Sequence, residues 1–246
     1  MEGFTMQPLV RTARTTGLFY LGLAVAGVLG FLLIRPQLYV AGDPAATLAN
    51  LTEHESLARA GVAFELLIVL TQALAAAWFY RLFRRADPVN ALGIAAFGLI
   101  NSTVILISAA MLGTALEGPR DAETVQSLFL LSDNLWGVGA IFFGLWLMPM
   151  GRCVLNSGWM PRPLGWVLVA GGVGYVAGAF LRYLLPDPGI LTDLVALPAS
   201  VGEFWIVGYL LIFGVRRSVT TAPGPDDQHG DVGPAATVPT AGRPHQ

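Results

Sequence analysis

Lysine is missing from this chain of 246 residues: all fourteen basic side chains belong to arginine. Chemistry that needs a lysine amine, such as a Schiff base or a Walker A phosphate loop, is therefore excluded. Cys153 has no second cysteine with which to form a disulfide within the chain. The three histidines are His54 and two in the C-terminal tail, and none has a partner at the spacing of metal ligands. We expect no metal, no cofactor and no enzyme active site.

Charged residues are also scarce, at 12% of the chain against about 25% in a typical soluble domain. Hydrophobic residues make up 54%, and the mean hydropathy is +0.63. The apolar residues stand in blocks, which is typical of a protein that crosses the lipid bilayer several times. The net charge of −2 provides no basic face for phosphates, so we expect no nucleic-acid partner.

Six apolar runs are long enough to cross about 30 Å of hydrocarbon, which takes about 20 helical residues. We therefore predict an all-α, polytopic membrane bundle of six transmembrane helices. Thr52 and Glu55 match a capping box at the start of the second helix, and Asp43-Pro44 predicts a short capped helix before it. The predicted spans are residues 17–34, 59–80, 91–115, 125–150, 164–185 and 194–215.

The distribution of arginine predicts the orientation of these spans. With the N-terminus in the cytoplasm, nine arginines flank the cytoplasmic ends of the spans, and four lie on or near the other side. This bias follows the positive-inside rule and places both termini in the cytoplasm of a cell whose inner or plasma membrane holds the protein. The first run continues to Ile34 and is too long for a typical signal peptide, so we interpret it as an uncleaved span.

The six spans predict a single membrane domain over residues 1–217. Residues 218–246 are rich in Pro, Gly and Thr and lack an apolar face, which predicts a disordered cytoplasmic tail. Small residues recur at helical spacing in the fifth span and predict close helix packing, with a homodimer contact as one use of this face. They are Ala170, Gly174 and Gly178, with Gly171 and Gly172 beside them.

Three acids, Glu65, Asp133 and Glu203, lie within the predicted spans. At about 1.5 Å per residue they lie about 18–26 Å from the cytoplasmic ends of their helices, in the outer half of the membrane. A charged side chain at the bilayer centre costs about 2.5–3.5 kcal/mol even on the lenient insertion scale. Arg182 reaches a similar depth and is a natural counter-ion. We predict a ligand or proton site in a polar cavity open to the outside, lined by the three acids, with Arg182 paired to one of them.

The alternative is that these acids only satisfy contacts between helices. Asn101 and Gln72 lie nearer the midplane as supporting polar residues, and such side chains more often join helices than bind ligands. Arg35, at the end of the first span, is expected to extend to the membrane interface. A weak internal similarity relates the first and last hairpins, because in each an arginine ends one helix and an acid lies in the next. The two pairs are Arg35 with Glu65 and Arg182 with Glu203.

Four stretches carry a resemblance to a known family. They are AGDPAATLANL at 41–51, RAGVAFELL at 59–67, FFGLWLMPMGRCVLNSGWMPRPLGWVLVAGG at 142–172 and LPASVGEFWIVGYLLIFGV at 197–215. From about Arg11 to Arg217 the chain resembles the bacterial domain-of-unknown-function family 4386 (DUF4386), membrane proteins with about six spans. The resemblance implies acids at Glu65 and Glu203 and a polar residue near Asp133, and it implies no activity.

Our leading functional hypothesis is a protein that binds or transports a small solute or couples to protons through this cavity. The second is a non-catalytic membrane partner or assembly protein whose buried acids only fix helix packing. An intramembrane enzyme acting on a lipid ranks last, because nothing in the spacing of the acids asks for acid–base chemistry.

Overall fold

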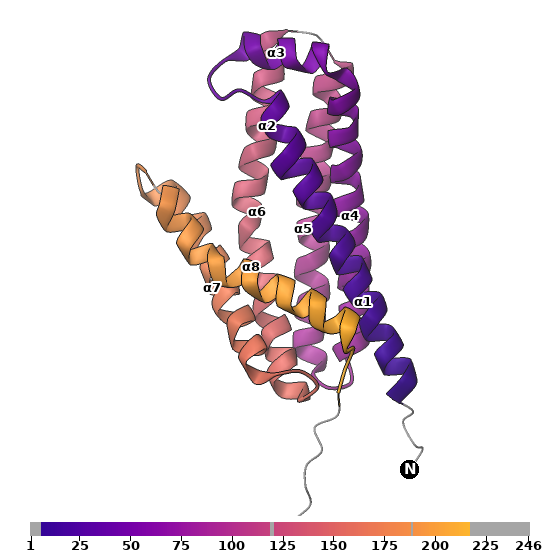
Figure 1. Ribbon diagram of the computed structural model, residues 1–246. Helices are drawn as coiled ribbons and strands as arrows, with labels where there is room; N and C mark the ends of the chain where they lie inside the picture. The colour runs from indigo at the N-terminus through magenta and orange to yellow at the C-terminus, as the bar shows by residue number, and fades with distance from the viewer. Residues whose placement is uncertain (1–5, 119–120, 188, 217–246) are drawn as a thin grey trace, which may run out of the picture.

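The structure is a computed structural model that describes residues 6–118, 121–187 and 189–216 (Figure 1). Every regular element in these residues is helical. The first span is continuous through α1 (Met6–Gly27), the π-helix η1 (Val28–Ile34) and α2 (Arg35–Leu38). The others are α3 (Pro44–Glu53), α4 (Glu55–Phe83), α5 (Pro88–Glu117), α6 (Ala122–Ser157), α7 (Arg162–Leu184) and α8 (Gly189–Ile212).

Six helices are long and apolar enough to cross a membrane, which confirms the predicted all-α bundle of six spans. The first four of these helices extend beyond the predicted limits at both ends, whereas α7 and α8 begin before the predicted starts and end at Leu184 and Ile212, short of the predicted 185 and 215. In α6, 36 residues span about 54 Å, more than the hydrocarbon is thick. The side of the membrane on which the termini lie stays a prediction, and the predicted tail, 218–246, lies outside the described residues.

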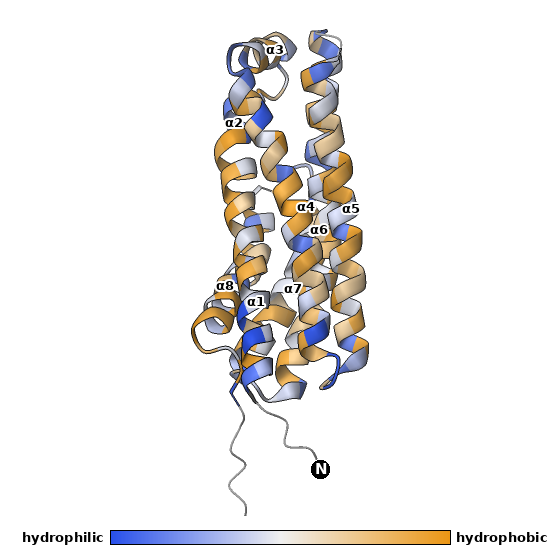
Figure 2. Cartoon of the chain, turned by 90° about the vertical axis from the view of Figure 1, so that its right-hand side faces the viewer, coloured by the Kyte–Doolittle hydropathy of each residue, from blue (hydrophilic) through white to orange (hydrophobic). Residues whose placement is uncertain are grey.

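The first span, α4, α5 and α6 run side by side along the length of the molecule, and α3 lies across one end, here called the α3 end (Figure 1). Helix α1 starts at the opposite end, and the chain turns toward that same end after α8, as an even number of spans requires (Figure 1). There the N–H of Arg216 donates to the carbonyl of Trp159, between α6 and α7. Hydrophilic residues concentrate at these two ends, whereas the middle of the bundle is largely hydrophobic (Figure 2). Leu18, Leu92 and Phe204 are 59%, 61% and 68% exposed, as suits side chains that face lipid.

Glycines allow α7 and α8 to pack closely, as the small residues of the fifth span predict. A Cβ on Gly172 would come within 2.7 Å of the carbonyl oxygen of Gly144 in α6, and a Cβ on Gly174 would collide with the carbonyl oxygen of Val195 in α8. These glycines are therefore covered by helices of the same chain. Gly172 and Gly174 are therefore not free for the predicted homodimer contact, and the homodimer itself stays a prediction.

The short helix α3 begins at the predicted cap, whereas the second span, α4, does not begin at its predicted capping box. The carboxylate of Asp43 caps α3 by accepting from the Ala46 N–H at 2.9 Å. Thr52 lies inside α3, where its hydroxyl donates to the carbonyl of Leu48. The predicted capping box is therefore wrong: α4 starts after His54, which makes no side-chain cap.

Candidate functional site

The three acids of the predicted cavity lie in three different environments. Glu65 pairs with Arg35, Asp133 pairs with Arg182, and Glu203 accepts hydrogen bonds from two tyrosines. The helices explain the separation, because α4 packs against the first span and α5, whereas α8 packs against α7 and the first span. The prediction of one cavity lined by all three acids is therefore wrong, since Glu65 lies apart from the other two.

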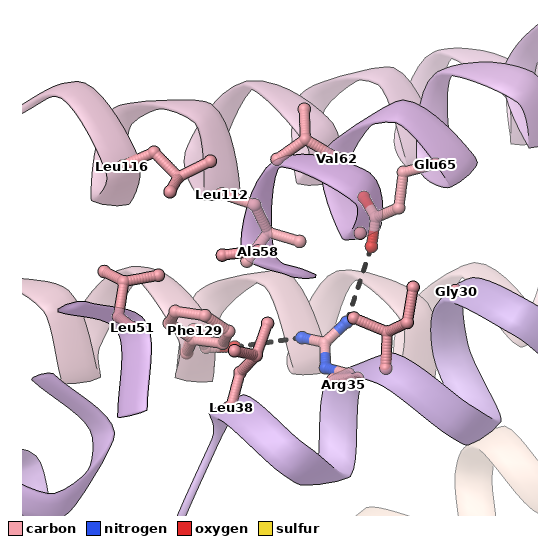
Figure 3. A pocket seen from close by; sticks show the side chains of 12 residues that line it. Gly30, Arg35, Leu38, Leu51, Ala58, Val62, Glu65, Leu112, Leu116 and Phe129 are labelled. Carbon is pink, nitrogen blue, oxygen red and sulfur yellow. Dashed lines mark hydrogen bonds and ion pairs between the residues drawn. The ribbon is translucent and has the colours of Figure 1, made fainter. Parts of the chain in front are cut away.

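Arg35 is buried and reaches inward from the start of α2 (Figure 3). Its Nη2 donates to the carbonyl of Phe129 at 3.1 Å and to Oγ of Ser132 at 2.8 Å, both on α6. Its Nη1 lies 3.5 Å from Oε1 of Glu65, which also accepts from Nε1 of Trp136 at 3.2 Å. The expectation that Arg35 extends to the membrane interface is wrong, because its side chain turns inward to Glu65 on α4 and to Phe129 and Ser132 on α6.

The surroundings of Arg35 and Glu65 leave no space for a solute. The adjoining cavity measures about 20 Å³, room for about one water molecule, and its other lining residues are apolar (Figure 3). The hydroxyl of Ser132 lies 2.6 Å from that of Ser108, so the polar network continues into α5. It thereby joins the first span, α4, α5 and α6, which is the geometry of a structural ion pair.

Arg182 forms the predicted ion pair, and its partner is Asp133. Nη2 of Arg182 lies 2.8 Å from Oδ2 of Asp133, and their side chains are 41% and 30% exposed. The pair lines a cavity of about 600 Å³ between α6, α7 and α8, together with Asp193 and Thr192 of α8. Because both side chains are partly exposed, this is a polar wall of a cavity and not a sealed contact.

Glu203 is held by two phenols. Its Oε1 accepts from the hydroxyl of Tyr20 on α1 at 2.7 Å, and its Oε2 accepts from the hydroxyl of Tyr175 on α7 at 3.0 Å. The carboxylate lines a second cavity, of about 280 Å³, where α8 meets the first span. Among the described residues, the ion pairs do not include Glu203. It differs in this respect from Glu65 and Asp133.

The two larger cavities adjoin each other, because Phe31, Trp136 and Phe143 line both. Their rings follow one another, with centroids 4.8 Å apart from Phe31 to Trp136 and 6.3 Å apart from Trp136 to Phe143. Tyr175 continues the row at 6.1 Å from Phe143. We call the two cavities with this wall the aromatic groove; Asp133 and Arg182 lie in its larger part and Glu203 in its smaller part.

Gln72 and Asn101 lie away from the aromatic groove. Nδ2 of Asn101 donates to Oε1 of Gln72 at 3.0 Å, and both side chains are fully buried between α4 and α5. Their contact is interhelical, and neither residue lines the cavities described here.

Sequence reasoning missed the aromatic residues of the site, because Tyr20, Trp136 and Tyr175 stand in apolar runs where aromatic residues are common. Arg35 did leave a signal. In the weak similarity between the hairpins it is matched with Glu65, and these two residues are indeed in contact. The second half of that similarity does not carry over, since Arg182 contacts Asp133 and not Glu203.

Comparison with known proteins agrees with the resemblance noted in the sequence. The model of the family described as domain of unknown function (DUF4386) matches residues 15–214, from the middle of α1 to just beyond α8. A protein of Archaeoglobus fulgidus described as uncharacterized is 30% identical over 153 residues, which cover 62% of this chain and 82% of that protein. No solved structure matches the chain. The family match covers well over half of the residues, and the chain belongs to the DUF4386 family.

Proposed function

We propose that this multi-pass membrane protein binds a small solute in the aromatic groove and carries it across the membrane, with Glu203 holding the solute or a coupled proton. One observation carries the proposal: a carboxylate lies within a span, at the wall of a cavity, without an ion-pair partner among the described residues. Its cost is about 2.5–3.5 kcal/mol even on the lenient insertion scale. Helix packing alone would be served by an uncharged side chain.

The dimensions of the groove support binding without chemistry on the solute. Cavities of about 600 and 280 Å³ fall in or close to the range of about 300–1,000 Å³ that small-molecule sites occupy. The walls are mainly apolar and aromatic, with a few polar groups to orient a ligand. In this proposal Asp133 and Arg182 form the polar mouth, and the α3 end faces outward, as the distribution of arginine predicts.

The proposal requires water to reach the groove, and two neighbouring positions on α8 test this. Ser200 lines the cavity beside Glu203, whereas Val201 is 50% exposed and is not among the residues that line it. We expect Ser200→Cys to react in intact cells with a small, membrane-impermeant thiol reagent and Val201→Cys to stay unlabelled. The two positions lie one residue apart, so they share depth and helix but differ in what they face.

The background for this test is Cys153→Ser. Cys153 is fully buried in α6 and would stay unlabelled in either orientation, so it cannot report the topology. The exposed residues Ala45 in α3 and Ala86 at the opposite end serve better. With the α3 end outside, Ala45→Cys reacts and Ala86→Cys does not. Equal absence of reaction at Ser200→Cys and Val201→Cys in a folded protein would refute a water-accessible groove.

A second candidate function is that of a non-catalytic partner or assembly protein. It is favoured by the interhelical contacts of Arg35 with Glu65, of Asp133 with Arg182 and of Gln72 with Asn101, which account for these polar groups through packing. For this function Ser200→Cys should be inert, and Glu203→Gln should change only the stability of the protein.

A further inference from the structure

The charged residues that line the aromatic groove bear on the charge of its ligand, and this inference rests on the function proposed above. Its lining residues include three acids, Asp133, Asp193 and Glu203, and one base, Arg182. When all are ionised, their formal charge is −2. Such an excess attracts a cation and repels an anion, and the attraction is strongest at Glu203, which is less exposed than Asp193 and has no ion-pair partner among the described residues.

The aromatic wall selects the kind of cation. The rings of Phe31, Trp136, Phe143 and Tyr175 form a row along the groove, and the centroids of successive rings lie 4.8–6.3 Å apart. Aromatic faces attract organic cations, and cages of such rings are a known means of binding quaternary ammonium groups. Small metal ions instead prefer several oxygen ligands. Both oxygens of Glu203 already accept phenol hydrogen bonds, and no group of three metal-binding side chains occurs among the described residues.

We propose that the aromatic groove binds a hydrophobic organic cation, with the positive charge near Glu203 and the apolar substituents against Trp136 and Phe143. The apolar residues of the smaller cavity, among them Leu23, Val28 and Val207, surround the acid with surface that suits such substituents. An organic cation with an apolar body therefore matches both features of the site, its negative charge and its apolar wall.

The aromatic wall also connects the groove to the buried ion pair. Trp136 lines the groove and donates to Glu65, and the guanidinium of Arg35 lies 5.2 Å from the centroid of the Phe31 ring. Glu65 therefore contacts Trp136, and Arg35 contacts Phe31. Through these contacts the ion pair positions both rings in the wall of the groove.

A pair of ions with the same shape and opposite charge tests the inference. The full chain is purified and placed in lipid nanodiscs, and the binding of tetraphenylphosphonium and of tetraphenylborate is measured by equilibrium dialysis. Nanodiscs without protein measure how much of each ion dissolves in the lipid. We expect saturable binding of tetraphenylphosphonium to the protein and no saturable binding of tetraphenylborate.

Two variants separate charge from space. Glu203→Gln removes the charge and should weaken binding of tetraphenylphosphonium at least tenfold, which corresponds to about 1.4 kcal/mol. Ala24→Phe adds a ring at the wall of the smaller cavity, leaves Glu203 in place and should weaken binding as well. Glu117→Gln changes an acid at the end of α5, outside the groove, and should bind like the wild type.

Equal binding of the two ions, binding of neither, or unchanged binding by Glu203→Gln would each overturn the inference. The thiol-labelling experiment keeps this failure distinct from failure of the proposed function. If Ser200→Cys reacts with the aqueous reagent while tetraphenylphosphonium does not bind, the groove is open and the class of ligand is wrong. If Ser200→Cys is inert, the groove itself is refuted.

Discussion

Removal of one partner from the buried ion pair of Arg35 and Glu65 should destabilise the protein strongly. Their side chains are 9% and 5% exposed, and Arg35 also serves Phe129 and Ser132 on α6. Breaking a buried pair costs about 3–5 kcal/mol, because the remaining charge is left without compensation. We therefore expect Arg35→Met and Glu65→Leu each to lower the free energy of unfolding by about this amount.

The double variant distinguishes a true pair from two independent effects. Arg35→Met with Glu65→Leu leaves no buried charge, so it should cost less than the sum of the single variants by at least about 2 kcal/mol. The free energies come from reversible unfolding of the purified protein in mixed micelles by increasing sodium dodecyl sulfate, followed by circular dichroism. Costs that add to within about 0.5 kcal/mol would refute the reasoning.

An exposed ion pair on α4, the helix that carries Glu65, is the matched control. Nη2 of Arg59 lies 2.8 Å from Oε1 of Glu55, but these side chains are 57% and 40% exposed. Exposed pairs of this kind couple by only about 0.3–0.5 kcal/mol, because water already solvates both charges. The same cycle on Arg59→Met and Glu55→Leu should therefore show a much smaller coupling, although the distance between the charges is shorter.

Two further predictions use the same unfolding measurement. Gly174→Ala should destabilise the protein by about 1–3 kcal/mol, because the new Cβ would overlap a carbonyl of α8. Gly113→Ala, whose Cβ would have no atom within 4 Å, should stabilise the protein by about 0.5–1 kcal/mol. Equal effects of the two substitutions would contradict the close packing of α7 on α8. Asp87 caps α5. Burial raises the pKa of its carboxyl, but hydrogen bonds from Asn90 and Asn156 lower this pKa by more, so the net pKa lies below the ordinary value. The contribution of Asp87 is therefore complete above an ordinary pKa of about 3.9 and is lost as the pH falls through the lower folded value, so the advantage of wild type over Asp87→Asn should shrink as the pH is lowered below about 3.9. An advantage that does not change with pH would contradict this.

Local signals predicted the parts of the fold that depend on neighbours in sequence. The apolar runs predicted the six spans, Asp43 predicted the start of α3, and the glycines of α7 predicted close packing. The capping box at Thr52 failed because Asp43-Pro44 had already started a helix that continues past it.

The candidate site was predicted only in part. Glu203 and Asp133 were identified from the cost of an acid in a span, and both line the aromatic groove. Arg35 was wrongly assigned to the membrane interface. The acceptors that hold it inside the bundle lie on α4 and α6, far from Arg35 in the sequence, so no local pattern could predict them.

The sequence by itself determined that this chain is a bundle of six apolar helices, because the transfer of an apolar run into lipid depends on its own residues and their number. Only the tertiary structure decided which polar groups meet. The hydroxyl of Tyr20 and the carboxylate of Glu203 are 183 residues apart in the chain, and Arg35 and Phe129 are 94 apart. Such contacts depend on the rotation of each helix and on its neighbours, which are set by the packing of all six helices together. The wall of the aromatic groove likewise combines three helices, with Phe31 from the first span, Trp136 and Phe143 from α6 and Tyr175 from α7, so it forms only when these helices pack together. In Figure 1, α7 and α8 run obliquely to the other spans.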